Sequence, residues 1–252
     1  MAFGTEKQVY TGTRTIDQAE FDAGLRAHML RVYNYMASGL ALTGIFAIVI
    51  AQLSVVTNDA GQIVALTNLG NTLFGSPLKW VVMLAPLGMV FFLSARLHRM
   101  SQSTAQITFW IYAAMMGISL ATIFIAFTGA SVARVFFITA GTFAGMSLWA
   151  YTTKKDLSGW GSFLFMGLIG IIIASIVNIF ISSSALQFAV SVIGVLVFVG
   201  LTAYDTQNIK NEYAEHLDEE SAGKLAISGA LRLYLDFINL FIMLMHLFGD
   251  RR

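Results

Sequence analysis

Hydrophobic stretches long enough to cross a bilayer recur along the whole chain, and this repetition limits the possible folds more than any other feature. About 20 consecutive apolar residues span the hydrocarbon core as a helix, because each backbone polar group is then satisfied inside the segment. Of the 252 residues, 57% are hydrophobic and only 12% are charged, about half the charge of a typical soluble domain. The sequence therefore predicts an all-α membrane protein that crosses the bilayer several times.

Seven stretches fit such helices, which predicts a seven-transmembrane-helix bundle. They cover about Val32 to Leu53, Leu78 to Ala95, Ala105 to Phe127, Ser131 to Tyr151, Gly161 to Ile181, Leu186 to Gln207 and Ile227 to Gly249. Residues 1–31 are polar and mixed in charge, and we expect a cytoplasmic N-terminal arm there with an interfacial helix. Residues 32–249 then form a single transmembrane domain. The stretch Val55 to Ser76, rich in Asn, Thr and Gly, is expected to be a long external loop.

Basic residues fall in alternating loops, and this distribution orients the helices. One side carries the N-terminal arm and the loops that contain Arg96 and Arg99, Lys154 and Lys155, and Lys210 and Lys224. The last of these loops, Asn208 to Lys224, is the most charged part of the chain. Loops rich in Lys and Arg stay in the cytoplasm, so we predict a cytoplasmic N-terminus and a periplasmic C-terminus. Arg251 and Arg252 oppose this orientation, and a last helix that turned back would place the C-terminus inside.

The composition also excludes several kinds of site. The chain has no cysteine, which rules out disulfides, thiolate metal sites and thiol nucleophiles. A net charge of +1 argues against binding of nucleic acid. No histidine cluster has metal-ligand spacing, and no cofactor is predicted. The glycine pairs Gly141 with Gly145 and Gly167 with Gly170 are expected to let helices pack closely.

Two acids lie inside predicted helices instead of loops. Asp236 sits within the last helix, and Asp205 lies near the end of the preceding one. A carboxylate at membrane depth is costly unless it faces a protein interior, water, a proton or an ion. Asp205 is five residues from Lys210 and Asp236 is nine from Ile227, which places them roughly 8 and 13 Å from the cytoplasmic ends of their helices. Helix ends vary by ~2–4 residues, so the two acids could be level.

If the two carboxylates are close, their chemistry follows from electrostatics. Two such groups in a low-dielectric site resist being ionised together, so the pair can share one proton near neutral pH. When both are ionised they attract a hard cation, and their oxygen atoms suit Ca²⁺. A pair that is closed when it shares a proton and open when ionised would be a pH-coupled gate. The alternative is that each acid is separately hydrogen-bonded and structural.

Three arginines could supply the counter-charge. Arg96 ends the second predicted helix on the side where both acids lie, and it is our candidate for a latch on the pair. Arg99 competes for that role. Arg96 could also serve only to set topology, with its long stem in lipid and its charge at the interface. Arg232 lies one turn before Asp236 and could pair with it locally.

Two motifs give the chain a family resemblance. The motif AYDTQNIK (Ala203 to Lys210) holds the first acid, and the more specific LYLDFINLF (Leu233 to Phe241) holds the second. With the segment from Lys154 to Gly170 and the spacing of all seven helices, they make the chain similar to the Bax inhibitor-1 family, the transmembrane Bax inhibitor motif proteins. The resemblance covers about Arg26 to Gly249. The long first loop and the ARLHRM segment resemble the proteobacterial branch, which implies the bacterial inner membrane.

The resemblance implies a seven-helix fold whose last helix is central and wrapped by the other six. Members of this family are described as pH-sensitive Ca²⁺ leak channels, and their paired aspartates match Asp205 and Asp236 by motif. The arginine that latches the pair in the family matches Arg96. An acid that some relatives carry on the second helix is absent here, since Lys79 to Ala95 contains no carboxylate.

These observations predict a channel and not an enzyme. We expect a pH-sensitive Ca²⁺ leak channel in which Ca²⁺ is the permeant ion, protons control the gate and the lipid bilayer is the main partner. Protein partners are not predicted. One alternative is an interaction protein that modulates other membrane proteins or a stress response. Another is an intramembrane aspartyl protease, which also uses Tyr-Asp on one helix and Asp on the next. Its second Asp follows a glycine-rich segment, whereas residues 233–236 here read Leu-Tyr-Leu-Asp.

Overall fold

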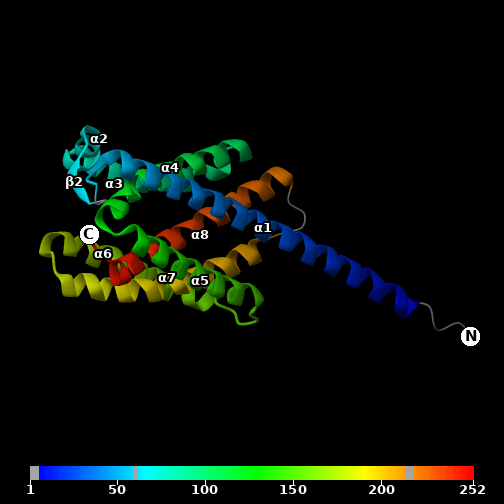
Figure 1. Cartoon of the computed structure of the whole chain (residues 1–252). Helices are drawn as coiled ribbons and strands as arrows, with labels where there is room; N and C mark the ends of the chain where they lie inside the picture. The colour runs from blue at the N-terminus through cyan, green and yellow to red at the C-terminus, as the bar shows by residue number, and fades with distance from the viewer. Residues whose placement is uncertain (1–5, 60–61, 214–217) are drawn as a thin grey trace, which may run out of the picture.

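The computed structural model describes residues 6–59, 62–213 and 218–252, with side chains from Glu20 onward. Helices dominate these ranges, and the two strands within them form one short hairpin (Figure 1). In chain order the elements are α1 (Glu6–Ser54), β1 (Val55–Thr57), β2 (Ile63–Leu66), α2 (Asn68–Gly70), a π-helix (Asn71–Gly75), α3 (Leu78–Arg96), a 3₁₀ turn (Leu97–Arg99), α4 (Gln102–Ala126), α5 (Gly129–Thr152), a second 3₁₀ turn (Ser158–Trp160), α6 (Gly161–Ile181), α7 (Ser184–Glu212) and α8 (Glu219–Phe248).

Seven helices in the described ranges are long and apolar enough to cross a membrane, namely α1 and α3 to α8. This confirms the predicted all-α seven-helix class. The helix α6 has the predicted bounds, whereas α7 and α8 both extend further toward the loop that joins them. The charged loop predicted over Asn208 to Lys224 is therefore shorter than expected. Residues 214–217 of that loop lie outside the described residues.

The helix α8 occupies the centre of the bundle. In its most apolar window 56% of the residues are buried, against 11–33% in the other six spans. It packs against α1, α4, α5 and α7, and Figure 1 shows it running between α1 with α4 on one side and α5 with α7 on the other. The helices α3 and α6 pack mainly on α4 and α7. The last helix is thus central as expected, but four neighbours form most of its wrapping instead of six.

The helix α1 is longer than the sequence suggested. It passes through residue 31 without a break, so it begins well before the predicted Val32. The reason is a buried apolar stripe that continues the helical spacing on both sides of that residue, formed by Leu25, Met29, Val32 and Met36. The division into an arm and a membrane domain at residue 31 stays a prediction.

The predicted external loop has structure of its own. The strands β1 and β2 pair antiparallel, with Val55 opposite Leu66. Thr67 then ties the loop back to α1, because its hydroxyl donates to the carbonyl of Leu53 at 2.8 Å and its N–H to that of Ser54 at 3.0 Å. Gly70 fits against the same carbonyl of Ser54, where a Cβ would collide. We call the end of the bundle with this hairpin the outer end, and the end with the α7–α8 connection the inner end.

The last residues of the chain also lie at the outer end, opposite the start of α1 (Figure 1). The carbonyl of Asp250 accepts from the N–H of Thr128 at 2.9 Å, and the N–H of Arg252 donates to the carbonyl of Ala126 at 3.0 Å. The side chain of Asp250 pairs with Arg134 at 2.8 Å. Residues 250–252 are therefore fastened to the turn between α4 and α5. The two ends of the membrane domain lie on opposite sides, as an odd number of spans requires, while the sidedness in the membrane stays a prediction.

The expectation of close packing at two glycine pairs was largely wrong. Among the described residues, a Cβ added at Gly141, Gly145 or Gly170 would meet no other group within 4 Å. Only Gly167 of the four faces another helix closely, with a Cβ placed 2.9 Å from a methyl carbon of Val197. Glycine spacing alone does not tell which face of a helix meets a neighbour, and here three of the four glycines face outward.

Candidate functional site

The interface between α7 and α8 is where the two helices that carry acids meet. Two glycines make their close approach possible. A Cβ at Gly194 on α7 would lie 2.8 Å from the side chain of Met243 on α8, and a Cβ at Gly229 on α8 would lie 3.1 Å from Ile209 on α7. One contact lies on the outer side of the acids and the other on the inner side. The acids are therefore held at a tight helix–helix contact.

The structure brings Asp205 and Asp236 together. Their carboxyl groups lie within side-chain hydrogen-bonding reach of each other. Asp236 is only 5% exposed, whereas Asp205 is half-buried. The oxygen Oδ2 of Asp236 is buried and finds no hydrogen-bond donor among the described residues. A buried acceptor without a donor is costly, and a single proton on the pair would supply the missing donor. The two acids therefore lie close enough to share a proton, and the sharing itself stays a prediction.

Arg232 is the positive charge beside the pair. It lies one turn before Asp236 on α8, and its charge acts on both acids. Its guanidinium also forms a two-pronged ion pair with Glu212 at the end of α7, in which Nη1 donates to Oε1 at 2.9 Å and Nη2 donates to Oε2. The Nε atom is buried without a partner among the described residues. The helical spacing of four residues to Asp236 was the signal in the sequence that pointed to Arg232.

Arg96 occupies a different position. It ends α3, is exposed, and within the described ranges forms no hydrogen bond or ion pair with either acid. The 3₁₀ turn Leu97–Arg99 follows it, and Arg99 is exposed as well. In this conformation the structure brings together Asp205, Asp236 and Arg232, and leaves both predicted latch residues at the surface. A latch by Arg96 or Arg99 stays a prediction.

Two polar residues that follow Asp205 on α7 bind α5 and the loop after it. Gln207 holds the loop between α5 and α6: its Oε1 accepts from the N–H of Leu157 at 2.7 Å, and its Nε2 donates to the carbonyl of Lys155 at 2.8 Å. The amine of Lys210 donates to the carbonyl of Tyr151 at 2.9 Å. The motif therefore fixes α7 against its neighbours and so fixes the position of Asp205.

A line of hydroxyl groups leads from the inner end toward Asp205. The hydroxyls of Tyr33 and Ser147 lie 2.6 Å apart, and those of Ser147 and Thr206 lie 2.9 Å apart. Tyr33 and Ser147 line a pocket of about 970 Å³ between α1 and α5, whose other lining residues include Arg26 and Lys210. Neither acid lines this largely apolar pocket. Thr206, the chain neighbour of Asp205, ends the line of hydroxyl groups. Sequence reasoning missed it, because nothing marks Tyr33 or Ser147 among the many hydroxyl residues of these helices.

The outer side of the pair is filled by apolar groups. Met243 lies two turns further along α8 and packs into the space left by Gly194, and Leu240 is fully buried. Phe237 packs edge-on against Phe143 of α5, with ring centroids 5.5 Å apart. In this conformation polar groups lie on the inner side of the pair and apolar groups fill its outer side.

A seven-helix apolar bundle with an acid pair between α7 and the central helix α8 defines an all-α, multi-pass membrane protein. Its family is shown by comparison with known proteins. The model of the family described as "Inhibitor of apoptosis-promoting Bax1" matches residues 25–252, so the chain belongs to the Bax inhibitor-1 family. This confirms the resemblance that the two motifs indicated.

Relatives match over nearly their whole length. The chain is 47% identical over 232 residues to the inner membrane protein YbhL of Escherichia coli (strain K12), which covers 91% of this chain and 94% of that protein. It is 47% identical over 242 residues to an uncharacterized protein of Rickettsia prowazekii (strain Madrid E), covering 96% and 97%. An uncharacterized protein of Caulobacter vibrioides is 42% identical over 251 residues.

Proposed function

We propose that this protein is a pH-sensitive Ca²⁺ leak channel of the bacterial inner membrane, gated by Asp205 and Asp236. The observation that carries the proposal is the meeting of these two acids at the α7–α8 interface, with one buried carboxylate oxygen that lacks a donor among the described residues. The line of hydroxyl groups through Tyr33, Ser147 and Thr206 also supports it, because these polar groups lead to the chain neighbour of Asp205. The relative YbhL is described as an inner membrane protein, which supports the proposed location in the inner membrane.

The state of the shared proton sets the gate. With one proton on the pair, a hydrogen bond joins α7 to α8 and the apolar seal around Met243 stays closed. When that proton leaves, two adjacent negative charges in a low-dielectric site repel each other. Separation of the helices or entry of a cation relieves this repulsion. Flux is therefore expected to rise as the pH rises through the range in which the pair loses its proton.

The pair suits a hard cation in passage. Ca²⁺ takes about six to eight oxygen ligands, and two carboxylates supply at most four. Among the described residues, no three His, Cys, Asp or Glu side chains lie together as metal ligands do. A cation at the pair would therefore keep several water molecules, and the pocket at the inner end offers a route for them. Incomplete coordination favours release, which a channel needs.

Ca²⁺ flux into liposomes at several pH values tests the proposal. The full-length protein is reconstituted with a Ca²⁺ indicator inside the vesicles, and Asp205→Asn, Asp236→Asn and the double variant are compared with wild type. We expect the pH dependence of flux to disappear in the double variant. The matched control is Asp59→Asn, an exposed loop acid that follows β1 at the outer end of the bundle, away from the pair. An unchanged pH profile in all three pair variants would contradict the gate.

The same acid pair could also suit an intramembrane aspartyl protease, and a second assay separates the two functions. The reconstituted protein is incubated with a transmembrane peptide, and the products are analysed by mass spectrometry. We expect no cleavage. Cleavage that is lost in both Asp205→Asn and Asp236→Asn would replace the channel proposal by the protease.

A further inference from the structure

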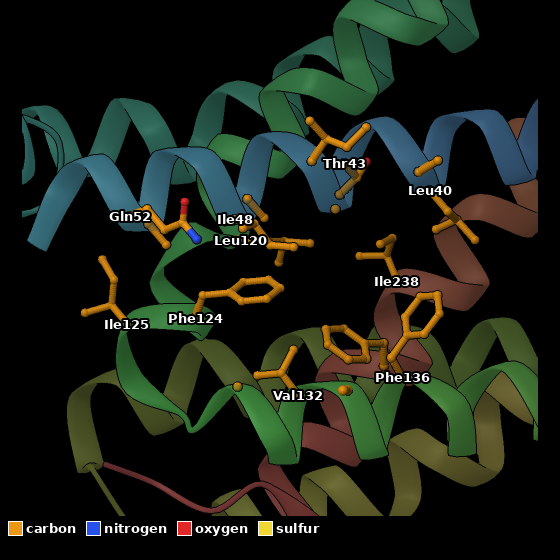
Figure 2. A pocket seen from close by; sticks show the side chains of 18 of the residues that line it. Leu40, Thr43, Ile48, Gln52, Leu120, Phe124, Ile125, Val132, Phe136 and Ile238 are labelled. Carbon is orange, nitrogen blue, oxygen red and sulfur yellow. The ribbon is translucent and has the colours of Figure 1, made fainter. Parts of the chain in front are cut away.

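A long apolar groove lies on the outer half of the bundle, away from the acid pair. Its walls come from α1 above and from α4, α5 and α8 below, and its volume is about 940 Å³, at the upper end of the ~300–1,000 Å³ that small-molecule sites occupy (Figure 2). Figure 2 shows Ile48, Leu120 and Phe136 projecting into it. Along α1 it extends from Ala37 to Gln52, roughly 22 Å at ~1.5 Å per residue.

The groove faces the lipid phase. Ile45, Ile48 and Phe137 on its rim are all exposed, and in the bilayer such surfaces meet acyl chains. One leaflet is about 15 Å deep, half of a ~30 Å hydrocarbon core. The groove is therefore longer than one leaflet and can hold a whole acyl chain.

The outer end of the groove is polar and positively charged. Gln52, Thr57 and Arg252 line it there, and Arg252 is the one charged residue among the described residues of the lining. Its Nε donates to the carbonyl of Phe127 at 3.0 Å and its backbone N–H is tied to Ala126, so the guanidinium is held in place at the mouth. The nearby carboxylate of Asp250 is already paired with Arg134. The groove thus combines an apolar lining with the guanidinium of Arg252 held at its outer end, where lipid headgroups would lie.

From this arrangement we propose that the groove is a binding site for one phospholipid of the leaflet at the outer end of the bundle. Its acyl chain lies along α1 between Gln52 and Ala37, and its phosphate binds the guanidinium of Arg252 with the amide of Gln52 beside it. A charge-assisted hydrogen bond between guanidinium and phosphate is about twice as strong as a neutral one. The site is independent of the Ca²⁺ proposal, because none of the acids of the pair lines it.

Two glycines allow the groove to be filled without disturbing the fold. A Cβ at Gly44 on α1, or at Gly129 at the start of α5, would meet no described group within 4 Å, and both residues line the groove. Gly44→Leu and Gly129→Leu therefore each project a side chain into it from opposite walls. Gly141→Leu is the matched control, since Gly141 is equally unobstructed but lies outside the groove.

Native mass spectrometry of the full-length protein with phosphatidylglycerol measures the occupancy. We expect wild type and Gly141→Leu to retain one lipid with equal affinity, and Gly44→Leu and Gly129→Leu to bind it about tenfold more weakly, because each displaces several buried methylene groups. Size-exclusion profiles in detergent check that each variant is folded. If one of the two groove variants does not fold, the other alone is enough for the test. Wild-type affinity in a folded groove variant would overturn the proposal.

A comparison of headgroups tests the role of Arg252. Wild type should prefer phosphatidylglycerol to diacylglycerol, which has the same chains and no phosphate, by about tenfold. Arg252→Gln should lose that preference. Arg251→Gln should keep it, because Arg251 lies over the ring of Phe127 and does not line the groove. Equal binding of the two lipids by wild type, or an unchanged preference in Arg252→Gln, would overturn the assignment of the phosphate to Arg252.

Discussion

The α7–α8 interface and the outward faces of α5 and α6 both carry glycines, but only the interface uses them for contact. Gly194 and Gly229 let α7 and α8 approach on either side of the acid pair, whereas Gly141, Gly145 and Gly170 face open space. What differs is the face of the helix on which they lie. Gly194 and Gly229 are buried, whereas the three outward glycines are exposed, even though α5 also carries buried polar residues such as Thr139 and Ser147. Helix contact in this bundle therefore depends on which face carries the glycine and not on glycine spacing alone.

The largest expected effect comes from placing a leucine at an interface glycine and comparing it with a leucine at an outward glycine. Gly194→Leu forces its side chain into Met243, and overpacking of this kind costs about 1–3 kcal/mol. Gly141→Leu should change stability little. Thermal unfolding in detergent micelles measures both. Equal melting temperatures for the two variants would mean that the interface has no special packing.

Removing single arginines should distinguish the charge inside the interface from the charge at the surface. In Arg232→Ala the pair loses the adjacent positive charge that favours its ionised form, so the midpoint of the flux–pH profile should move about one unit to higher pH. Arg96→Ala should leave that midpoint in place, and it should raise flux at neutral pH if Arg96 latches the closed form. Liposome Ca²⁺ flux measures both quantities. If the midpoint of the flux–pH profile shifts in Arg96→Ala and not in Arg232→Ala, then Arg96 is the counter-charge of the pair.

Two buried tyrosines where α8 meets α4 allow a finer test. The hydroxyl of Tyr234 lies 2.6 Å from that of Thr43, which itself donates to the carbonyl of Ala113 at 2.9 Å. Tyr234→Phe should cost about 1 kcal/mol of unfolding free energy. The hydroxyl of Tyr112 is buried without a partner among the described residues, so Tyr112→Phe should be neutral or stabilising. Chemical denaturation in micelles compares them, and a larger loss in Tyr112→Phe would contradict the bonding described.

The smallest effect is expected at the start of α8. Asp218 caps this helix, and hydrogen bonds from the hydroxyl and N–H of Ser221 hold its pKa below the ordinary value of 3.8. A lowered pKa means that the ionised cap stabilises the helix at neutral pH and loses its effect as the pH falls below 3.8. Asp218→Ala should speed amide hydrogen exchange at Ser221 and Ala222, while Asp218→Asn should retain most of the protection. Equal exchange in all three proteins would show that the cap does not order the first turn.

The sequence was sufficient to predict the seven-helix class and the closeness of the two acids. Runs of apolar residues define spans in lipid without reference to any neighbour, so four of the seven predicted helices, α3 to α6, lie within three residues of their observed bounds. The pairing of Asp205 with Asp236 was predictable because an acid at membrane depth needs a partner. The start of α1 was missed because residues 20–31 are polar on average. Their buried side depends on contacts with distant residues, such as Tyr213, which packs against Gly24.

What the sequence could not supply was the direction in which side chains point. Arg96 and Arg232 are both near the acids in depth, and only the packing of α8 decides which of them lies beside the pair. The hydroxyl line through Tyr33, Ser147 and Thr206 joins three helices that are far apart in sequence. The hairpin between β1 and β2 was also missed, since its strands are only three and four residues long.

The central position of α8 has a consequence for the order of synthesis. The ribosome delivers α8 after the six other spans, yet it fills the space that α1, α4, α5 and α7 surround. Until α8 enters the membrane, Asp205 on α7 has no second carboxyl group with which to share a proton, and the inward faces of four helices lack their common neighbour. The bundle can therefore mature only after α8 has been translated, and in a chain interrupted before α8 the inward faces of these helices stay uncovered.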